Sequence, residues 1–120
     1  MSLRDVKLTI ETESDGTCTF ASNEIVSGFL LGIEWVVGSL VAGVDAVISV
    51  EMASGVDRTL LTLTNANANA FYNLRESEHD NAGAATTGTC YPVVSGKPSI
   101  AVTSGGDTKS GACILYYAPV

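Results

Sequence analysis

The chain has few basic residues, and they do not cluster. Six lysine and arginine residues stand against thirteen acidic residues among 120, so the formal net charge is −7. The basic residues are scattered at Arg4, Lys7, Arg58, Arg75, Lys97 and Lys109. A basic stripe that could neutralise phosphates is missing, and an acidic surface works against binding to anionic membranes. We therefore expect neither nucleic acid nor membrane as a partner.

Cysteine is scarce as well. The three cysteines, Cys18, Cys90 and Cys113, match no zinc or CxxC spacing. An odd number is poor evidence for a secreted disulfide framework, so we expect buried free thiols, with one disulfide as the alternative. The first ten residues, MSLRDVKLTI, lack the apolar core of a signal peptide because charged residues interrupt them. These features predict synthesis in a reducing cytoplasm.

The side chains that most enzymes need are nearly missing. His79 is the only histidine, no GxSxG motif occurs, and Cys90 has no recognisable catalytic context. A second histidine that would complete a common zinc site is absent. We expect no enzyme activity, no catalytic residue, no cofactor and no metal site. The polar cluster of Arg75, Glu78, His79 and Asp80 is a possible binding loop, although a solvated loop is the simpler interpretation.

Charged residues make up only 16% of the chain, and one long segment is almost free of them. Ile25–Val44 contains a single charge, Glu34, and would pass a hydropathy test for a membrane helix. A carboxylate at mid-membrane would cost roughly 2.5–3.5 kcal/mol on insertion scales, and no basic cluster flanks either end. Because the segment is rich in β-branched residues and glycine, two buried strands joined through GSLVAG are the favoured interpretation.

What the sequence does contain is repeated alternation of apolar and polar residues. This pattern of period two predicts β-strands. It occurs over Arg4–Glu13, Thr17–Ser22, Gly28–Val37, Val44–Met52 and Arg58–Thr64. Two further strands, Lys97–Thr103 and Ala112–Tyr117, are expected to form a last hairpin. The turn residues SDG and SGGDTKSG predict hairpins between their flanking strands. The sequence therefore predicts an all-β fold: a jelly-roll-like antiparallel β-sandwich of about eight strands, in a single domain over residues 1–120.

Two connecting segments follow the strand at Arg58–Thr64. The alternating NANANA that begins at Asn65 is interpreted as a strand end that turns at the edge of the sandwich, since asparagine tolerates left-handed backbone conformations. A loop is expected at Arg75–Thr89. The sugar-stacking platform that the tyrosines and Phe71 could form is a weaker alternative to aromatic core packing.

Apolar residues on both faces of some strands predict association between subunits. In Gly28–Val37, the face opposite Trp35 is still largely apolar, and Ala112–Tyr117 is apolar on both faces. A monomer would expose one of these faces to water, so we expect a homo-oligomer. The possible oligomer interface consists of Leu30, Gly32, Glu34 and Val36.

Two long segments carry a resemblance to a known group of proteins. LLTLTNANANAFYNLRESEHDNAGAA and YPVVSGKPSIAVTSGGDTKSGACILYY resemble small structural proteins of tailed bacteriophages and prophages. The matching positions are Arg75, His79, Asp80, Gly83, Gly105, Gly106, Lys109 and Gly111. The chain departs from the group at Asn73-Leu74-Arg75, where Pro-Arg is usual.

The resemblance implies a virion structural protein rather than an enzyme. A capsid decoration or head-associated component is expected, made in the cytoplasm of the bacterial host and located in the virion. Its partners would be other virion proteins and further copies of itself, with a trimer expected because β-rich virion proteins often close on threefold axes. The alternative is a binding module on a tail or fibre, which contacts host glycan or protein through the Arg75–Thr89 loop.

Overall fold

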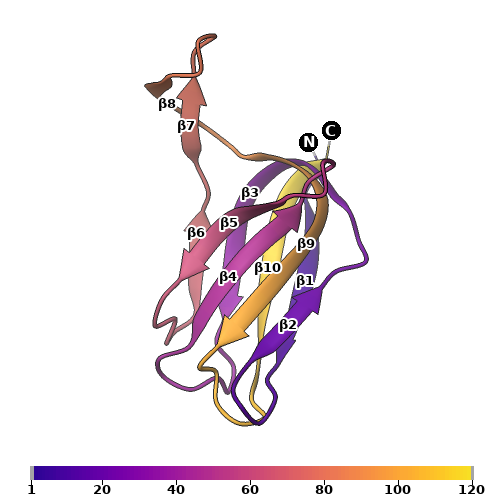
Figure 1. Cartoon of the computed structure of the whole chain (residues 1–120), viewed down its shortest axis with the longest axis vertical. Coiled ribbons are helices and arrows are strands. Elements are labelled where there is room, and N and C mark those ends of the chain that lie inside the picture. Colours follow the sequence, from indigo (N-terminus) through magenta and orange to yellow (C-terminus); the bar gives the residue numbers. More distant parts are fainter. Residues whose placement is uncertain (1, 120) are drawn as a thin grey trace.

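Ten β-strands and no helix make up the part of the chain that the computed structural model describes, residues 2–119 (Figure 1). The strands are β1 (Arg4–Glu11), β2 (Cys18–Ala21), β3 (Val26–Val36), β4 (Asp45–Glu51), β5 (Asp57–Leu63), β6 (Ala70–Asn73), β7 (Glu76–His79), β8 (Ala85–Cys90), β9 (Val93–Thr103) and β10 (Ser110–Pro119). All strand pairs are antiparallel. The predicted all-β sandwich is confirmed, with ten strands where about eight were expected.

Eight strands form two layers. The first sheet has the order β1-β10-β3-β6, and the second has the order β2-β9-β4-β5. The sheets join at one end of the sandwich, where the start of β9 pairs with the start of β3. The other two strands, β7 and β8, pair only with each other and project from that end as an arm (Figure 1).

The core lies between the two sheets and follows the predicted alternation. The largest fully buried side chains come from both layers: Leu8, Ile10, Leu30, Ile33, Trp35, Ile48, Ile100 and Leu115. Each contributes roughly 1.5–3 kcal/mol through burial. The Trp35 indole N–H donates to the Ala66 carbonyl at 2.9 Å, so its one polar atom is satisfied inside the core.

Strand β3 departs from the predicted alternation halfway along its length. Its register with β10 shifts between Tyr116 and Tyr117, which leaves Leu31 without a partner on that strand. Such a bulge reverses which residues point inward. Leu30, predicted to lie in the interface, is therefore fully buried, whereas Phe29, which regular alternation over Gly28–Val37 places on the same face as Trp35, is 43% exposed. The predicted sides of these two residues are wrong.

Two predicted hairpins are arches between the sheets. The SDG turn leads from β1 in the first sheet to β2 in the second, and SGGDTKSG leads from β9 in the second sheet to β10 in the first. The two turns contact each other, since Thr12 at the end of β1 donates its hydroxyl to the Gly106 carbonyl at 2.6 Å and accepts the Lys109 N–H. Turn residues predicted the change of direction but not the change of sheet.

The NANANA segment ties neighbouring loops to the sandwich. Asn65 has a left-handed φ of 51°, and Ala66 packs in the core. The side-chain carbonyl of Asn67 accepts the Gly43 N–H, and that of Asn69 accepts the Val37 N–H. The alternation therefore has a structural cause: asparagines bond to loops while the buried alanine takes little space.

The apolar segment takes the predicted form, and the cysteines do so only in part. Ile25–Val44 contributes β3 and the loop to β4, and no helix in residues 2–119 is long and apolar enough to cross a membrane. All three cysteines are free thiols. Cys113 is buried, as expected, whereas Cys18 and Cys90 are only half-buried.

Candidate functional site

The segment predicted as a loop at Arg75–Thr89 is instead a β-hairpin. Its turn is held by Asp80, whose carboxylate accepts the N–H groups of Ala82 and Ala84 at 2.9 Å each. Gly83 completes the turn with a φ of 84°, a value that favours glycine. The expected loop is wrong because the alternation that reveals a half-buried strand does not exist in an arm with no buried face.

The base of the arm is fixed by two arginines. The Arg58 guanidinium in β5 donates to the Val93 carbonyl at 2.8 Å and pairs with the Glu76 carboxylate at the start of β7. Arg75 lies over the Tyr91 ring, 4.6 Å from its centroid, and donates to Thr89. Tyr91 is 41% exposed, so this cation–π pair lies at the surface.

The four predicted binding-loop residues are not brought together around one point. Arg75 donates a hydrogen bond to the Thr89 carbonyl at the base of the arm, whereas the Asp80 carboxylate accepts the Ala84 N–H in the turn. The Glu78 carboxylate lies close to Gly88, since a Cβ added at Gly88 would be 2.8 Å from Glu78 Oε2. His79 is exposed, and no group of three metal-binding side chains occurs within residues 2–119. Their arrangement is that of a solvated arm, in which Arg75 and Asp80 each make their own local hydrogen bonds.

The predicted oligomer interface is split between two sides of β3. Leu30 is fully buried in the core because of the bulge, so it is unavailable to a second subunit. Gly32, Glu34 and Val36 lie on the outer face, where they pair with Tyr116, Ile114 and Ala112 of β10. Leu30 is therefore not part of any interface on the outer face, and the prediction that included it is wrong.

Four further side chains complete an apolar surface on this outer face. Phe71 of β6 pairs with Glu34 and covers Gly32, because a Cβ at Gly32 would lie 2.6 Å from the Phe71 ring. The Phe71 and Tyr116 rings lie 5.8 Å apart. We call this surface the outer strip; it consists of Phe29, Gly32, Glu34, Val36, Phe71, Ile114 and Tyr116. Its signals in the sequence are the apolar residues opposite Trp35 in Gly28–Val37 and the apolar character of both faces of Ala112–Tyr117.

Glu34 is the one charged member of the outer strip, and it has a partner. The Tyr116 hydroxyl donates to Glu34 Oε1 at 2.8 Å. This hydrogen bond, with help from desolvation and the nearby Glu34 charge, raises the pKa of Tyr116 above its ordinary value. At the surface of the outer strip, the pair presents a neutral hydroxyl and a carboxylate that accepts one hydrogen bond.

The outer face of the second sheet has a different character. Mostly small or polar side chains cover β9 and β4 there. These two strands have two exposed large apolar residues, Val47 and, at the junction with the first sheet, Val93. The outward-facing residues along the two strands are Asp45, Val47, Ser49, Glu51, Ser95, Lys97, Ser99, Ala101 and Thr103. Only the first sheet therefore has an outer face suited to apolar contact.

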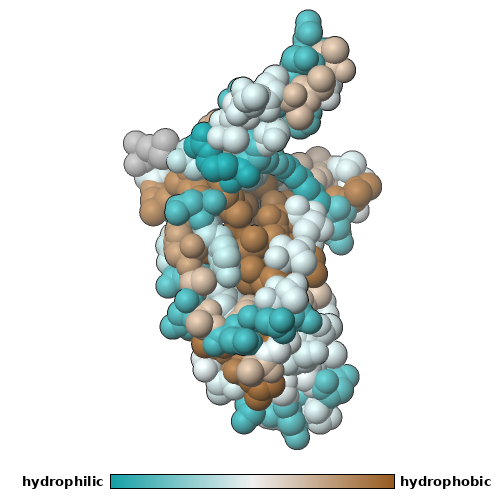
Figure 2. All heavy atoms as spheres, turned by 90° about the vertical axis from the view of Figure 1, so that its left-hand side faces the viewer, coloured by the Kyte–Doolittle hydropathy of each residue, from teal (hydrophilic) through white to brown (hydrophobic). Residues whose placement is uncertain are grey.

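Hydrophobic residues also gather on the side of the sandwich below the arm. Figure 2 shows them in the middle of the side that carries β5 and β6, with hydrophilic residues above and below. Half-buried Leu60 and Leu61 of β5 and Tyr72 of β6 pack against the core there. This side of the sandwich is left open, because β5 and β6 do not pair with each other.

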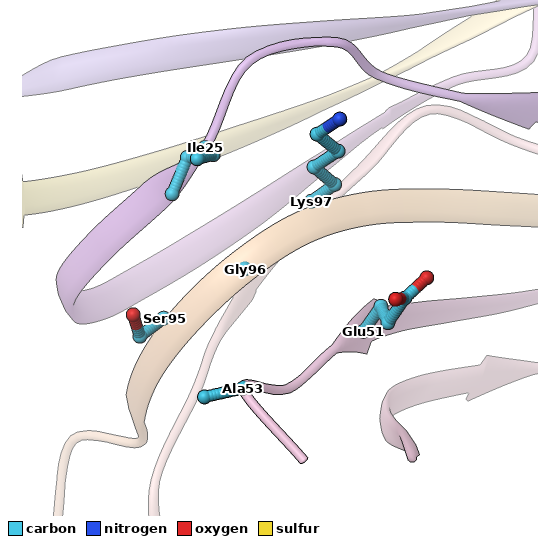
Figure 3. Close-up of a pocket in the computed structure, with 6 residues that line it drawn as sticks. All are labelled: Ile25, Glu51, Ala53, Ser95, Gly96 and Lys97. Carbon is cyan, nitrogen blue, oxygen red and sulfur yellow. The ribbon is translucent and has the colours of Figure 1, made fainter. Parts of the chain in front are cut away.

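A surface hollow of about 340 Å³ lies where β4, β9 and the start of β3 meet (Figure 3). Lys97 and Glu51 occupy paired positions on neighbouring strands, and Ile25 lies across from them. Gly96 also lines the hollow, and there is no room for a larger residue at this position: an added Cβ would lie only 1.7 Å from the Glu51 carbonyl oxygen. The hollow has one cation and one carboxylate but no nucleophile paired with a base, so its geometry offers no catalytic arrangement.

A scan against protein-family models, a search of curated proteins and a search of solved structures found no match to this chain.

Proposed function

We propose that the protein is a structural component of a bacteriophage or prophage particle, which forms a homo-oligomer and binds the head as a capsid decoration or head-associated protein. The resemblance of two long segments supports the phage assignment. The single structural observation that carries the proposal is the contrast between the two outer faces. Phe71 is 53% exposed and Phe29 43% exposed on the first sheet, whereas the second sheet presents small polar side chains.

The outer strip supports association through ordinary burial. Apolar area removed from water stabilises a contact by roughly 25 cal/mol per Å². Glu34 can enter such a contact at lower cost because Tyr116 already donates a hydrogen bond to it. Assembly of this kind needs no chemistry: many copies bind a repeating lattice, and the number of contacts supplies the strength.

The position in the particle can be tested by immunoelectron microscopy. An antibody raised against the purified chain would be applied to particles from an induced lysogen that encodes it. We expect gold label around the head, on intact particles and on empty heads alike. Absence of label from intact and disrupted particles would contradict a virion protein of any kind.

A second candidate is a tail- or fibre-associated module that contacts host glycan or protein through the arm. The observation in its favour is the projection of β7 and β8 away from the sandwich, with Arg75 stacked on exposed Tyr91 at the base (Figure 1). Label on the tail tip rather than the head would favour this function. Arg75→Ala and Tyr91→Ala variants should then lose binding to host cells, whereas a head protein should show no such binding.

A further inference from the structure

Most of the free strand edges in this molecule are protected against pairing with another chain. Charged residues occupy β1, and β2, β6 and β7 are only four residues long. Short strands and charges are the usual means by which sheets avoid edge-to-edge association. Two edges lack this protection: the second half of β5, Thr59–Leu63, and the whole of β8, Ala85–Cys90, which contain no charged residue and no proline.

The free edge of β5 lies beside an apolar surface. β5 pairs with β4 on one side only. Within residues 2–119, no backbone group of Thr59–Leu63 makes a hydrogen bond outside this ladder. Leu60 and Leu61 of this strand are half-buried and pack against the core. Figure 2 shows hydrophobic residues on the side of the sandwich that carries β5 and β6. An added strand would satisfy these backbone groups and shield apolar side chains at the same time.

Beyond its base, which Arg58 and Arg75 fix, the arm is weakly supported within its own molecule. β7 and β8 pair at only three positions, and between two of these β7 has one residue, Glu78, where β8 has three, Thr86 to Gly88. Most of its side chains are exposed, and neither strand pairs with the sandwich. An isolated two-stranded hairpin is at best marginally stable in water. The other edge of β8 is therefore available to a partner that would stabilise the arm.

We propose that β8 of one copy adds as a strand to the free edge of β5 in a neighbouring copy. This inference rests on the proposed homo-oligomer and names one of its contacts. The occupant is a second copy because both unprotected edges belong to this chain and are not paired with each other within it. The contact joins different surfaces of the two copies, so repetition closes a ring when the rotation allows it.

Two variants separate the donor from the acceptor. In the armless variant, Asn-Gly replaces Ser77–Thr89, because a two-residue turn can join the directly paired Glu76 and Cys90. In the edge variant, Thr59→Lys and Thr62→Lys place charges on β5. The matched control is Ala101→Lys with Thr103→Lys, which adds the same exposed charges to the same outer face on β9, a strand that has neighbours on both sides. Circular dichroism and thermal unfolding show whether each variant folds.

Light scattering coupled to size-exclusion chromatography measures the mass in solution, and so the number of chains, of the wild type and each variant. We expect the wild type and the β9 control to be oligomers, and the armless and edge variants each to be monomers. A mixture of the two monomers should form a one-to-one complex, because the edge variant still supplies an arm and the armless variant still supplies a free β5.

The other outcomes overturn the inference in distinguishable ways. An armless variant or an edge variant that keeps the wild-type mass shows that the oligomer forms without this contact, and leaves the proposed function standing. Two monomers that fail to combine show that the arm and β5 do not meet. A monomeric wild type overturns both the strand addition and the proposed homo-oligomer.

Discussion

Gly28 in β3 is restricted both by its backbone conformation and by the space around it. Its φ is 138°, and an added Cβ would lie 2.1 Å from the Ala118 carbonyl oxygen of β10. Gly28→Ala should lower the free energy of unfolding by about 3 kcal/mol or more, from backbone strain together with overpacking. Gly43→Ala is the matched control, since its φ is 92° but nothing lies within 4 Å of the added Cβ. A loss of about 1–2 kcal/mol is expected there, and equal losses in urea unfolding would contradict the steric argument.

The three thiols should differ in reactivity. Burial raises the pKa of the Cys113 thiol to about 12, so almost no thiolate is present at pH 8. A disulfide reagent should therefore modify Cys18 and Cys90 in the folded protein, and Cys113 only after unfolding in guanidinium. Three thiols that react equally fast without denaturant would show that β10 is not packed in the core as described.

Tyr116 should titrate at higher pH than an ordinary tyrosine. Its hydroxyl donates to Glu34, and this bond raises the pKa of Tyr116. Because the folded-state pKa is raised, the stabilisation is fully present below the unfolded-state value of about 10 and is lost as the pH rises through the folded-state pKa. Glu34→Gln should move the latest tyrosinate absorbance step to lower pH, and Tyr116→Phe should remove that step. An unchanged profile in Glu34→Gln would show that the hydrogen bond is not formed.

At the scale of elements, the NANANA connection should contribute to stability through particular asparagines. Asn69→Ala removes the acceptor of the Val37 N–H beyond the end of β3. The free energy of unfolding should fall by about 0.5–1.5 kcal/mol, the usual contribution of one hydrogen bond. Asn73→Ala in β6 is the control, since this exposed side chain makes no hydrogen bond within the described residues. Similar urea midpoints for the two variants would show that the Asn69 hydrogen bond does not contribute to stability.

Local patterns predicted the strands but not their partners. Alternation located β1, β4 and β9 because each has one buried face and one exposed face. It could not place Leu30, since the bulge depends on Tyr116 and Tyr117, which are more than eighty residues away in the sequence. It also could not show that SDG and SGGDTKSG cross between sheets. The arm was missed because β8, rich in threonine and exposed, has no apolar face that a pattern could reveal.

The candidate site was predictable to the same extent. Glu34 and Val36 were placed correctly on the face opposite Trp35, because the strand is regular beyond the bulge. Phe71 was not included, since only the pairing of β6 with β3 brings its ring over Gly32. The sequence therefore predicted an apolar outer face, while its extent across three strands depended on long-range pairing.

At the scale of the whole molecule, the two outer faces should respond differently to the same charge. Phe71→Lys places an ammonium group in the outer strip, where it should weaken self-association at least about tenfold by desolvation. Val47→Lys is the control on the outer face of the second sheet, where the side chain is also exposed. Its association should stay within about twofold of the wild type. Sedimentation velocity over a range of concentrations measures the self-association of both variants. Equal weakening in the two would show that the outer strip is not the surface through which the chains associate.

The central claim is that this chain assembles with copies of itself, and its mass in solution tests that claim most directly. Light scattering coupled to size-exclusion chromatography would be run on the wild type at micromolar concentrations. We predict a stable mass that is a multiple of the 12.4 kDa chain, with three chains the expected number. A single monodisperse peak at 12.4 kDa that does not change on concentration would contradict the account.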